Sequence, residues 1–138
     1  MKPTTIITFS IFASMITIVL FSFRPSQGFD LKASIGRGKE IYLVYCLSCH
    51  MDQGTGIENL YPPLAGSDYL IADKKRSIQQ ILYGATDTMK VNGKSYATPM
   101  AGVNLTDEQA SDLLNYVRNS WKNKGVPVKP AEVKAARK

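Results

Sequence analysis

The feature that most constrains this chain is the run Cys46-Leu47-Ser48-Cys49-His50, which contains both cysteines and the only histidine of the 138-residue sequence. The spacing C-x-x-C-H is the attachment signature of a c-type haem. Two thiols separated by two residues lie on one side of a helical turn, so both can bond to the porphyrin while the adjoining imidazole reaches the iron. The run predicts one covalently bound haem c, with Cys46 and Cys49 as attachment residues and His50 as an axial ligand.

Three other uses of a cysteine pair fit the sequence less well. A structural zinc site takes four nitrogen or sulfur ligands, and only three such side chains are present. A thioredoxin-like dithiol follows a strand, whereas residues 36–45 have the pattern of an amphipathic helix. A structural disulfide would leave the adjoining histidine unexplained. Haem attachment is the interpretation that uses all three side chains.

The first 28 residues have the features of an export segment. Lys2 precedes eighteen uncharged, mostly apolar residues, 6–23, and Ser26-Gln27-Gly28 fits a cleavage site with small residues. The apolar run also reaches the lower limit for spanning a bilayer. Two outcomes stay open: a signal peptide cleaved after Gly28, or an anchor that tethers the protein to the inner membrane. Both predict an exported, periplasmic domain.

The charge balance excludes one class of partner and permits another. Removing Lys2 and Arg24 from the 17 basic residues leaves 15 against 11 acidic residues, a formal charge of +4. No basic stripe is interleaved with aromatics, so nucleic-acid binding is not expected. A mildly basic surface permits steering toward an acidic redox protein, with Lys90, Lys94 and Lys74-Lys75-Arg76 as candidate docking charges. We expect a monomer.

Periodicity predicts an all-α domain with three helices. The first runs from about Ser34 to Cys49 and the second over residues 73–83. The third opens with a capping box, Thr106 and Gln109, and presents an apolar face along residues 113–121.

Gly38 predicts how the first and third helices meet. A glycine inside a helix costs about 1 kcal/mol relative to alanine, and close approach of another helix would compensate for that cost. Gly38 and Tyr42 are four residues apart and share a face. We expect the N- and C-terminal helices to cross there, with Tyr42 against Tyr116. The alternative is that Gly38 is a weak residue near a frayed helix start.

The end of the chain differs in composition from the helical part. After Trp121 the sequence turns to Lys, Pro and Val. We predict a basic surface tail over residues 123–138, with at most one helical turn from Ala131. The domain itself is placed at residues 29–122, where a chain of this size has a thin apolar core to which a buried haem would add.

A six-coordinate haem iron needs a second axial ligand, and methionine sulfur is the soft donor that remains. Two of the five methionines lie in the export segment, and Met51 adjoins His50 and cannot reach the opposite face. Met100 is favoured because a loop bounded by proline and glycine, residues 99–102, can cross the haem and lead into the last helix. Met89 is the alternative ligand, and an open or weakly bound site is a third possibility.

Pro62 and Pro63 are the candidates for orienting His50. A ligating histidine donates its second ring N–H to a carbonyl or carboxylate. Proline fixes the backbone and keeps its carbonyl, so we expect one of these two carbonyls to be the acceptor. The alternative is a rigid loop with no role toward His50.

The motifs together resemble the class I c-type cytochromes over about residues 34–121. They are C-x-x-C-H, the Pro62-Pro63-Leu64-Ala65-Gly66 loop, a late methionine and the final YVRNSW helix. Residues 61–74 are similar to the small cytochrome domains fused to bacterial copper nitrite reductases and other periplasmic oxidoreductases. The resemblance implies three to four helices around one haem, with Cys46 and Cys49 as thioethers and His50 and Met100 as axial ligands. Many relatives follow the ligand methionine with proline, whereas Pro99 precedes Met100 here.

These features predict a one-electron carrier, and not an enzyme, that passes electrons between exported or membrane respiratory redox proteins. His/Met ligation occupies both axial positions and raises the reduction potential. One alternative is a gas sensor or haem enzyme with a labile distal ligand, which would bind carbon monoxide readily. The other is a permanent electron-transfer subunit of a larger oxidoreductase complex, which would have the spectrum of the free carrier.

Overall fold

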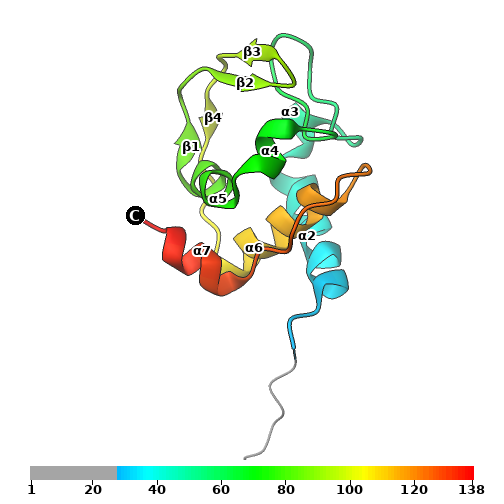
Figure 1. Cartoon of the computed structure of the whole chain (residues 1–138), viewed down its shortest axis with the longest axis vertical. Helices are drawn as coiled ribbons and strands as arrows, with labels where there is room; N and C mark the ends of the chain where they lie inside the picture. The colour runs from blue at the N-terminus through cyan, green and yellow to red at the C-terminus, as the bar shows by residue number, and fades with distance from the viewer. Residues whose placement is uncertain (1–27) are drawn as a thin grey trace, which may run out of the picture.

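The computed structural model describes residues 28–138, and within them the chain is mostly helical (Figure 1). The helices are α2 (Leu31–Tyr45), α3 (Leu47–His50), α4 (Asp68–Ala72), α5 (Lys74–Tyr83), α6 (Asp107–Asn119) and α7 (Pro130–Ala136). Two small antiparallel pairs occupy the loops: β1 (Gly84–Ala85) with β4 (Met100–Ala101), and β2 (Met89–Val91) with β3 (Lys94–Tyr96). The all-α prediction is confirmed, with these short strands as additions.

Helices α2 and α6 cross as Gly38 predicted (Figure 1). A Cβ atom on Gly38 would lie 1.9 Å from the Asp112 carbonyl oxygen, so only glycine permits this approach. Tyr42 is fully buried, and its ring centroid lies 5.2 Å from that of Tyr116. Gly38 is therefore a crossing point, and the alternative of a frayed helix start is wrong.

A buried polar network reinforces the crossing. The Asp112 carboxylate accepts hydrogen bonds from the Ser34 hydroxyl at 2.6 Å and from Nε and Nη2 of Arg37 at 2.6 and 2.8 Å. Asn115 donates from Nδ2 to Ser34 Oγ at 2.9 Å. Each buried polar atom named here has a partner, which is what makes polar burial tolerable.

Local capping sets where the helices begin. Asp30 and Asp73 accept from backbone N–H groups in the first turns of α2 and α5, and the Thr106–Gln109 capping box of α6 is present as predicted. The first predicted helix is divided, because Cys46 ends α2 and a separate turn, α3, begins at Leu47.

The prediction of a surface tail over residues 123–138 is wrong. Val128 and Val133 are completely buried, and both belong to the main hydrophobic core. Helix α7 begins at Pro130, in the first-turn position that suits proline. The lysines of this stretch suggested an exposed tail, but Val128 and Val133 between them face inward. Composition alone therefore gave the wrong prediction.

The predicted signal peptide or anchor, residues 1–28, lies outside the described residues except for Gly28. Among the helices of residues 28–138, none has the length and apolar character needed to cross a membrane.

Candidate haem-binding site

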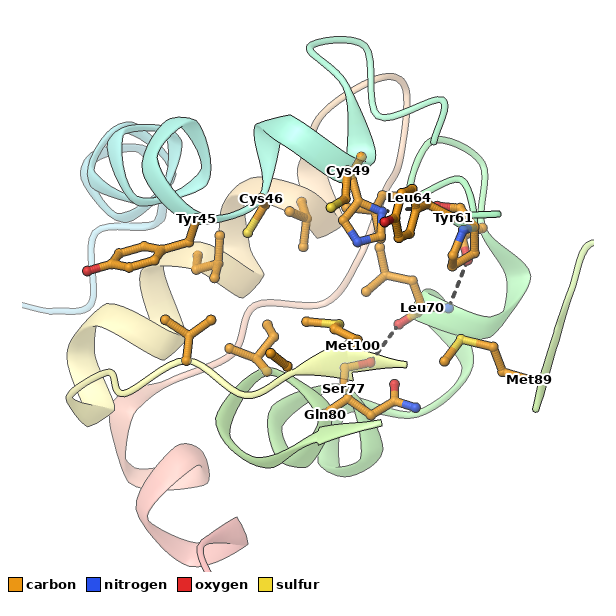
Figure 2. Close-up of a pocket in the computed structure, with 18 of the residues that line it drawn as sticks. Tyr45, Cys46, Cys49, Tyr61, Leu64, Leu70, Ser77, Gln80, Met89 and Met100 are labelled. Carbon is orange, nitrogen blue, oxygen red and sulfur yellow. Dashed lines mark hydrogen bonds between the residues drawn. The ribbon is translucent and has the colours of Figure 1, made fainter. Parts of the chain in front are cut away.

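A cavity of about 610 Å³ lies between α3, the loop that follows it, α5, β4 and α6. This volume is in the range of small-molecule and cofactor sites, about 300–1,000 Å³. Apolar side chains from α5 and α6 line its inner wall: Ile81, Leu113, Leu114 and Val117. In Figure 2, Cys46 and Cys49 lie on one wall, and Met100 lies on the wall opposite. Residues far apart in sequence therefore meet at one apolar site.

Cys46 and Cys49 are free thiols. Cys46 directly precedes α3, and Cys49 lies within it. Both are partly buried and both line the cavity. Burial, with a smaller contribution from Cys49, raises the pKa of the Cys46 thiol to about 11. The pair is not a disulfide, so both sulfurs are available for bonds to another group.

His50 is the last residue of α3, and its ring is held by the loop that follows this helix. Its Nδ1 atom lies 3.0 Å from the Pro62 carbonyl oxygen, which leaves Nε2 for a metal. The carbonyl contact that the sequence predicted for one of two prolines is made by Pro62, while Pro63 lines the cavity. Burial lowers the pKa of His50, and the hydrogen bond to Pro62 offsets part of this effect. The lowered pKa favours the neutral, metal-binding form of the ring.

Gly56 supports the Pro62 carbonyl. A Cβ atom on Gly56 would lie 2.6 Å from that carbonyl oxygen, and its N–H donates to the His50 carbonyl at 3.1 Å. With φ of +64°, this backbone also favours glycine. Residue 56 therefore helps to hold both the histidine and its acceptor.

Met100 is placed by the short β1–β4 pair. It lies opposite Ala85 in the register, and Gly84 lies opposite Ala101. A Cβ atom on Gly84 would be 2.4 Å from the Met100 carbonyl oxygen, so the two segments approach as closely as glycine allows. Met100 is partly buried against the hydrophobic core. Its loop is thereby fixed with little freedom.

Met89 also lines the cavity, from β2. In Figure 2 it lies to one side, beyond the wall that carries Met100. Its hairpin is closed by a tight turn in which Asn92 and Gly93 have φ of +49° and +82°, the backbone that Asn-Gly favours in two-residue hairpin turns. Met100 faces the cysteines more directly than Met89 does.

The donor set fits a c-type haem. Two free thiols, one imidazole with an uncommitted nitrogen and the thioether sulfurs of Met89 and Met100 line a single apolar cavity. The lining residues include no Lys, Arg, Asp or Glu. Within residues 28–138 no cluster of His, Cys, Asp and Glu is arranged to hold a metal ion by itself.

Three of the five predicted docking charges are engaged inside the domain. They are Lys94 with Glu58, Lys74 with Glu132, and Arg76 with the ring of Tyr69. Lys75 and Lys90 are exposed and form no ion pair within the described part of the chain. They are the two candidates that stay open for docking.

Two aromatic residues contribute to the site in a way that the sequence did not indicate. Tyr42 and Trp121 were expected only to pack, yet each donates a hydrogen bond to backbone that follows His50. The polar tip of a buried tyrosine or tryptophan usually finds a partner, but which partner depends on the fold.

The comparison with known families decides what this site belongs to. The sequence profile of the family described as cytochrome c matches residues 35–121, well over half of the chain. The chain belongs to the cytochrome c family. This membership establishes electron transfer through a covalently bound haem c, and the single C-x-x-C-H run provides for one haem. The class I fold predicted from the sequence is confirmed.

Named relatives of this cytochrome c are of two kinds. The cytochrome c subunit of alcohol dehydrogenase (quinone) from Gluconobacter oxydans is 34% identical over 88 residues, 62% of this chain and 18% of that subunit. The corresponding subunit from Komagataeibacter europaeus is 30% identical over 101 residues, 72% and 21%. Cytochrome c-552 of Thermus thermophilus is 34% identical over 89 residues, 61% and 67%. The chain spans about a fifth of the length of the dehydrogenase subunits.

Proposed function

We propose that this cytochrome c is a one-electron carrier whose iron is held between His50 and Met100, with Cys46 and Cys49 as the thioether residues. One observation carries the proposal: all four side chains line the same cavity, and Met100 lies opposite the wall that bears the cysteines (Figure 2). The bound haem supplies an iron that gains and returns one electron.

The surrounding residues support a carrier by holding both ligands still. The Pro62 carbonyl at 3.0 Å fixes the ring of His50, and the β1–β4 pair fixes the backbone of Met100. A site whose ligands keep their places in both redox states needs little reorganisation when the charge changes. With His50 and Met100 both bound to the iron, the haem would have no free position for a substrate, so we propose a carrier and not an enzyme.

The second candidate is a permanent electron-transfer subunit of a larger oxidoreductase. The observation that favours it is the similarity to proteins named as cytochrome c subunits of alcohol dehydrogenase (quinone). Against it stands the cytochrome c-552 relative, which this chain matches over two thirds of its length. In either case we propose other redox proteins as partners. The predicted export segment of residues 1–28 supports a periplasmic or membrane-tethered location, and we propose that the protein is a monomer.

The deciding experiment is the optical spectrum of haem-loaded protein, oxidised and reduced, for wild type and Met100→Ala. Ferric iron bound by a thioether gives a weak long-wavelength band. We expect wild type to have the band and to be inert to carbon monoxide, and Met100→Ala to lose the band. Met89→Ala, which removes the other thioether at the cavity, should retain it.

A wild type that lacks the band and binds carbon monoxide would overturn the carrier and favour a sensor or haem enzyme. A band that survives Met100→Ala but is lost in Met89→Ala would move the ligand to Met89. Co-purification of the full-length chain with a dehydrogenase would separate a permanent subunit from a free carrier.

A further inference from the structure

The residue that follows His50 has a strained backbone. Met51, the residue directly after α3, has φ of 61° and ψ of 164°, a region that is essentially restricted to glycine. A side chain there is unfavourable and persists only where surrounding contacts determine the conformation. The contacts around Met51 therefore indicate what the strain serves.

Two aromatic side chains donate hydrogen bonds to this strained segment. The Tyr42 hydroxyl donates to the Met51 carbonyl at 2.6 Å. Trp121 Nε1 donates to the Asp52 carbonyl at 3.0 Å. One donor comes from α2 and the other from the residues that follow α6. The crossing of α2 and α6 is thus connected directly to the backbone next to the histidine.

Both donors are themselves held firmly. The rings of Tyr42, Tyr116 and Trp121 form one cluster, with centroids 5.2 to 5.5 Å apart. Tyr42 is completely buried, and burial raises its pKa, so the hydroxyl keeps its proton. The Trp121 ring lies on the backbone of Gly54, where a Cβ atom would be 2.6 Å from Cε3. The indole cannot shift toward this loop.

We propose that Tyr42 and Trp121 are positioning residues of the haem site, which hold the strained Met51–Asp52 backbone and so fix the orientation of the His50 imidazole. The inference rests on the proposed ligation by His50. Pro62 holds the ring of the histidine, and the two aromatic donors hold the peptide that follows it. If the donor at residue 42 or 121 is removed, the Met51 backbone relaxes toward an allowed conformation. The imidazole of the preceding residue, His50, then turns with it.

The test compares Tyr42→Phe with Tyr116→Phe in the oxidised, haem-loaded protein. Both variants remove one hydroxyl from the same aromatic cluster, but the Tyr116 hydroxyl has no hydrogen-bond partner among residues 28–138. The readouts are the hyperfine-shifted proton resonances of the His50 ring and the reduction potential. We expect the His50 resonances and the reduction potential to change in Tyr42→Phe and to stay at wild-type values in Tyr116→Phe. Urea unfolding reports any general loss of stability.

Met51→Gly supplies an internal check, because glycine adopts the conformation of residue 51 without strain. In that background, Tyr42→Phe should shift the His50 resonances less than it does in wild type. If Tyr42→Phe does not fold, Trp121→Phe is measured in the same way, since it keeps a ring and removes only the indole N–H donor.

Equal shifts in Tyr42→Phe and Tyr116→Phe, or none in either, would overturn the inference and leave the aromatic cluster with a packing role. Failure of the proposed ligation has a different signature, because wild type itself would then lack hyperfine-shifted resonances from His50.

Discussion

The side-chain amide of Asn115 forms hydrogen bonds with both the N–H and the carbonyl of Val128. Asn115 Nδ2 donates to the Val128 carbonyl at 2.8 Å, and the Val128 N–H donates to Asn115 Oδ1, also at 2.8 Å. Both residues are completely buried. Ser111 adds a third bond to the same carbonyl at 2.7 Å. The segment that leads into α7 is therefore attached to α6 by the Asn115 side chain, which bonds both the N–H and the carbonyl of Val128.

Replacing Asn115 with alanine should detach this segment. The Val128 N–H would be left buried without a partner, and such a loss costs about 1–3 kcal/mol for each orphaned group. We expect Asn115→Ala to lower the free energy of unfolding by about 2–4 kcal/mol in urea titrations. Asn119→Ala is the control, because Asn119 bonds only a carbonyl of its own helix, at 3.0 Å. An equal effect of the two variants would contradict the assignment.

Gly38 and Gly36 offer a matched pair for testing the helix crossing. Both lie in α2, but a Cβ atom at 38 would be 1.9 Å from the Asp112 carbonyl, and one at 36 would meet nothing within 4 Å. Gly38→Ala should cost about 1–3 kcal/mol or more through overpacking. Gly36→Ala should stabilise by about 0.5–1 kcal/mol through helix propensity. Thermal unfolding of the haem-loaded protein measures both, and a stabilised Gly38→Ala would mean that the helices do not cross so closely.

The parts of the fold that the sequence predicted are those governed by local rules. The capping box of α6 depends on two side chains three residues apart, and the crossing depends on one glycine in a helix. Chemistry that requires particular residue types was equally visible, since Cys46, Cys49 and His50 are the only side chains of their kinds.

The parts that were missed depend on contacts across the fold. Helix α4 has five residues, too few for periodicity to show. The burial of Val128 and Val133 requires partners on α6 that lie far away in sequence. The hydrogen bond from Tyr42 to Met51 spans only nine residues, but an aromatic pattern predicts a ring's burial and not the partner of its hydroxyl.

The ion pair between Lys74 and Glu132 predicts a dependence of stability on pH. The hydrogen bond from Lys74 lowers the pKa of Glu132 from its ordinary value of 4.5. A carboxylate with a depressed folded-state pKa stabilises the protein above its unfolded-state pKa, and this stability is lost as the pH falls through the folded-state value. Glu132→Gln should therefore lower the urea midpoint at pH 7 and have less effect near pH 3. A Glu132→Gln effect that is independent of pH would show that the pair does not stabilise through its charge.

Gly84 and Gly93 test how the Met100 loop is held. Both have positive φ, +84° and +82°, so alanine is strained at each. A Cβ atom at 84 would also lie 2.4 Å from the Met100 carbonyl oxygen, whereas one at 93 would meet nothing within 4 Å. Gly84→Ala must therefore push β1 and β4 apart and move Met100. We expect the long-wavelength ferric band to weaken or vanish in Gly84→Ala, with carbon monoxide binding gained by the ferrous protein, and to be unchanged in Gly93→Ala. Bands of equal strength in the two variants would mean that the sulfur reaches its place without the support of β1.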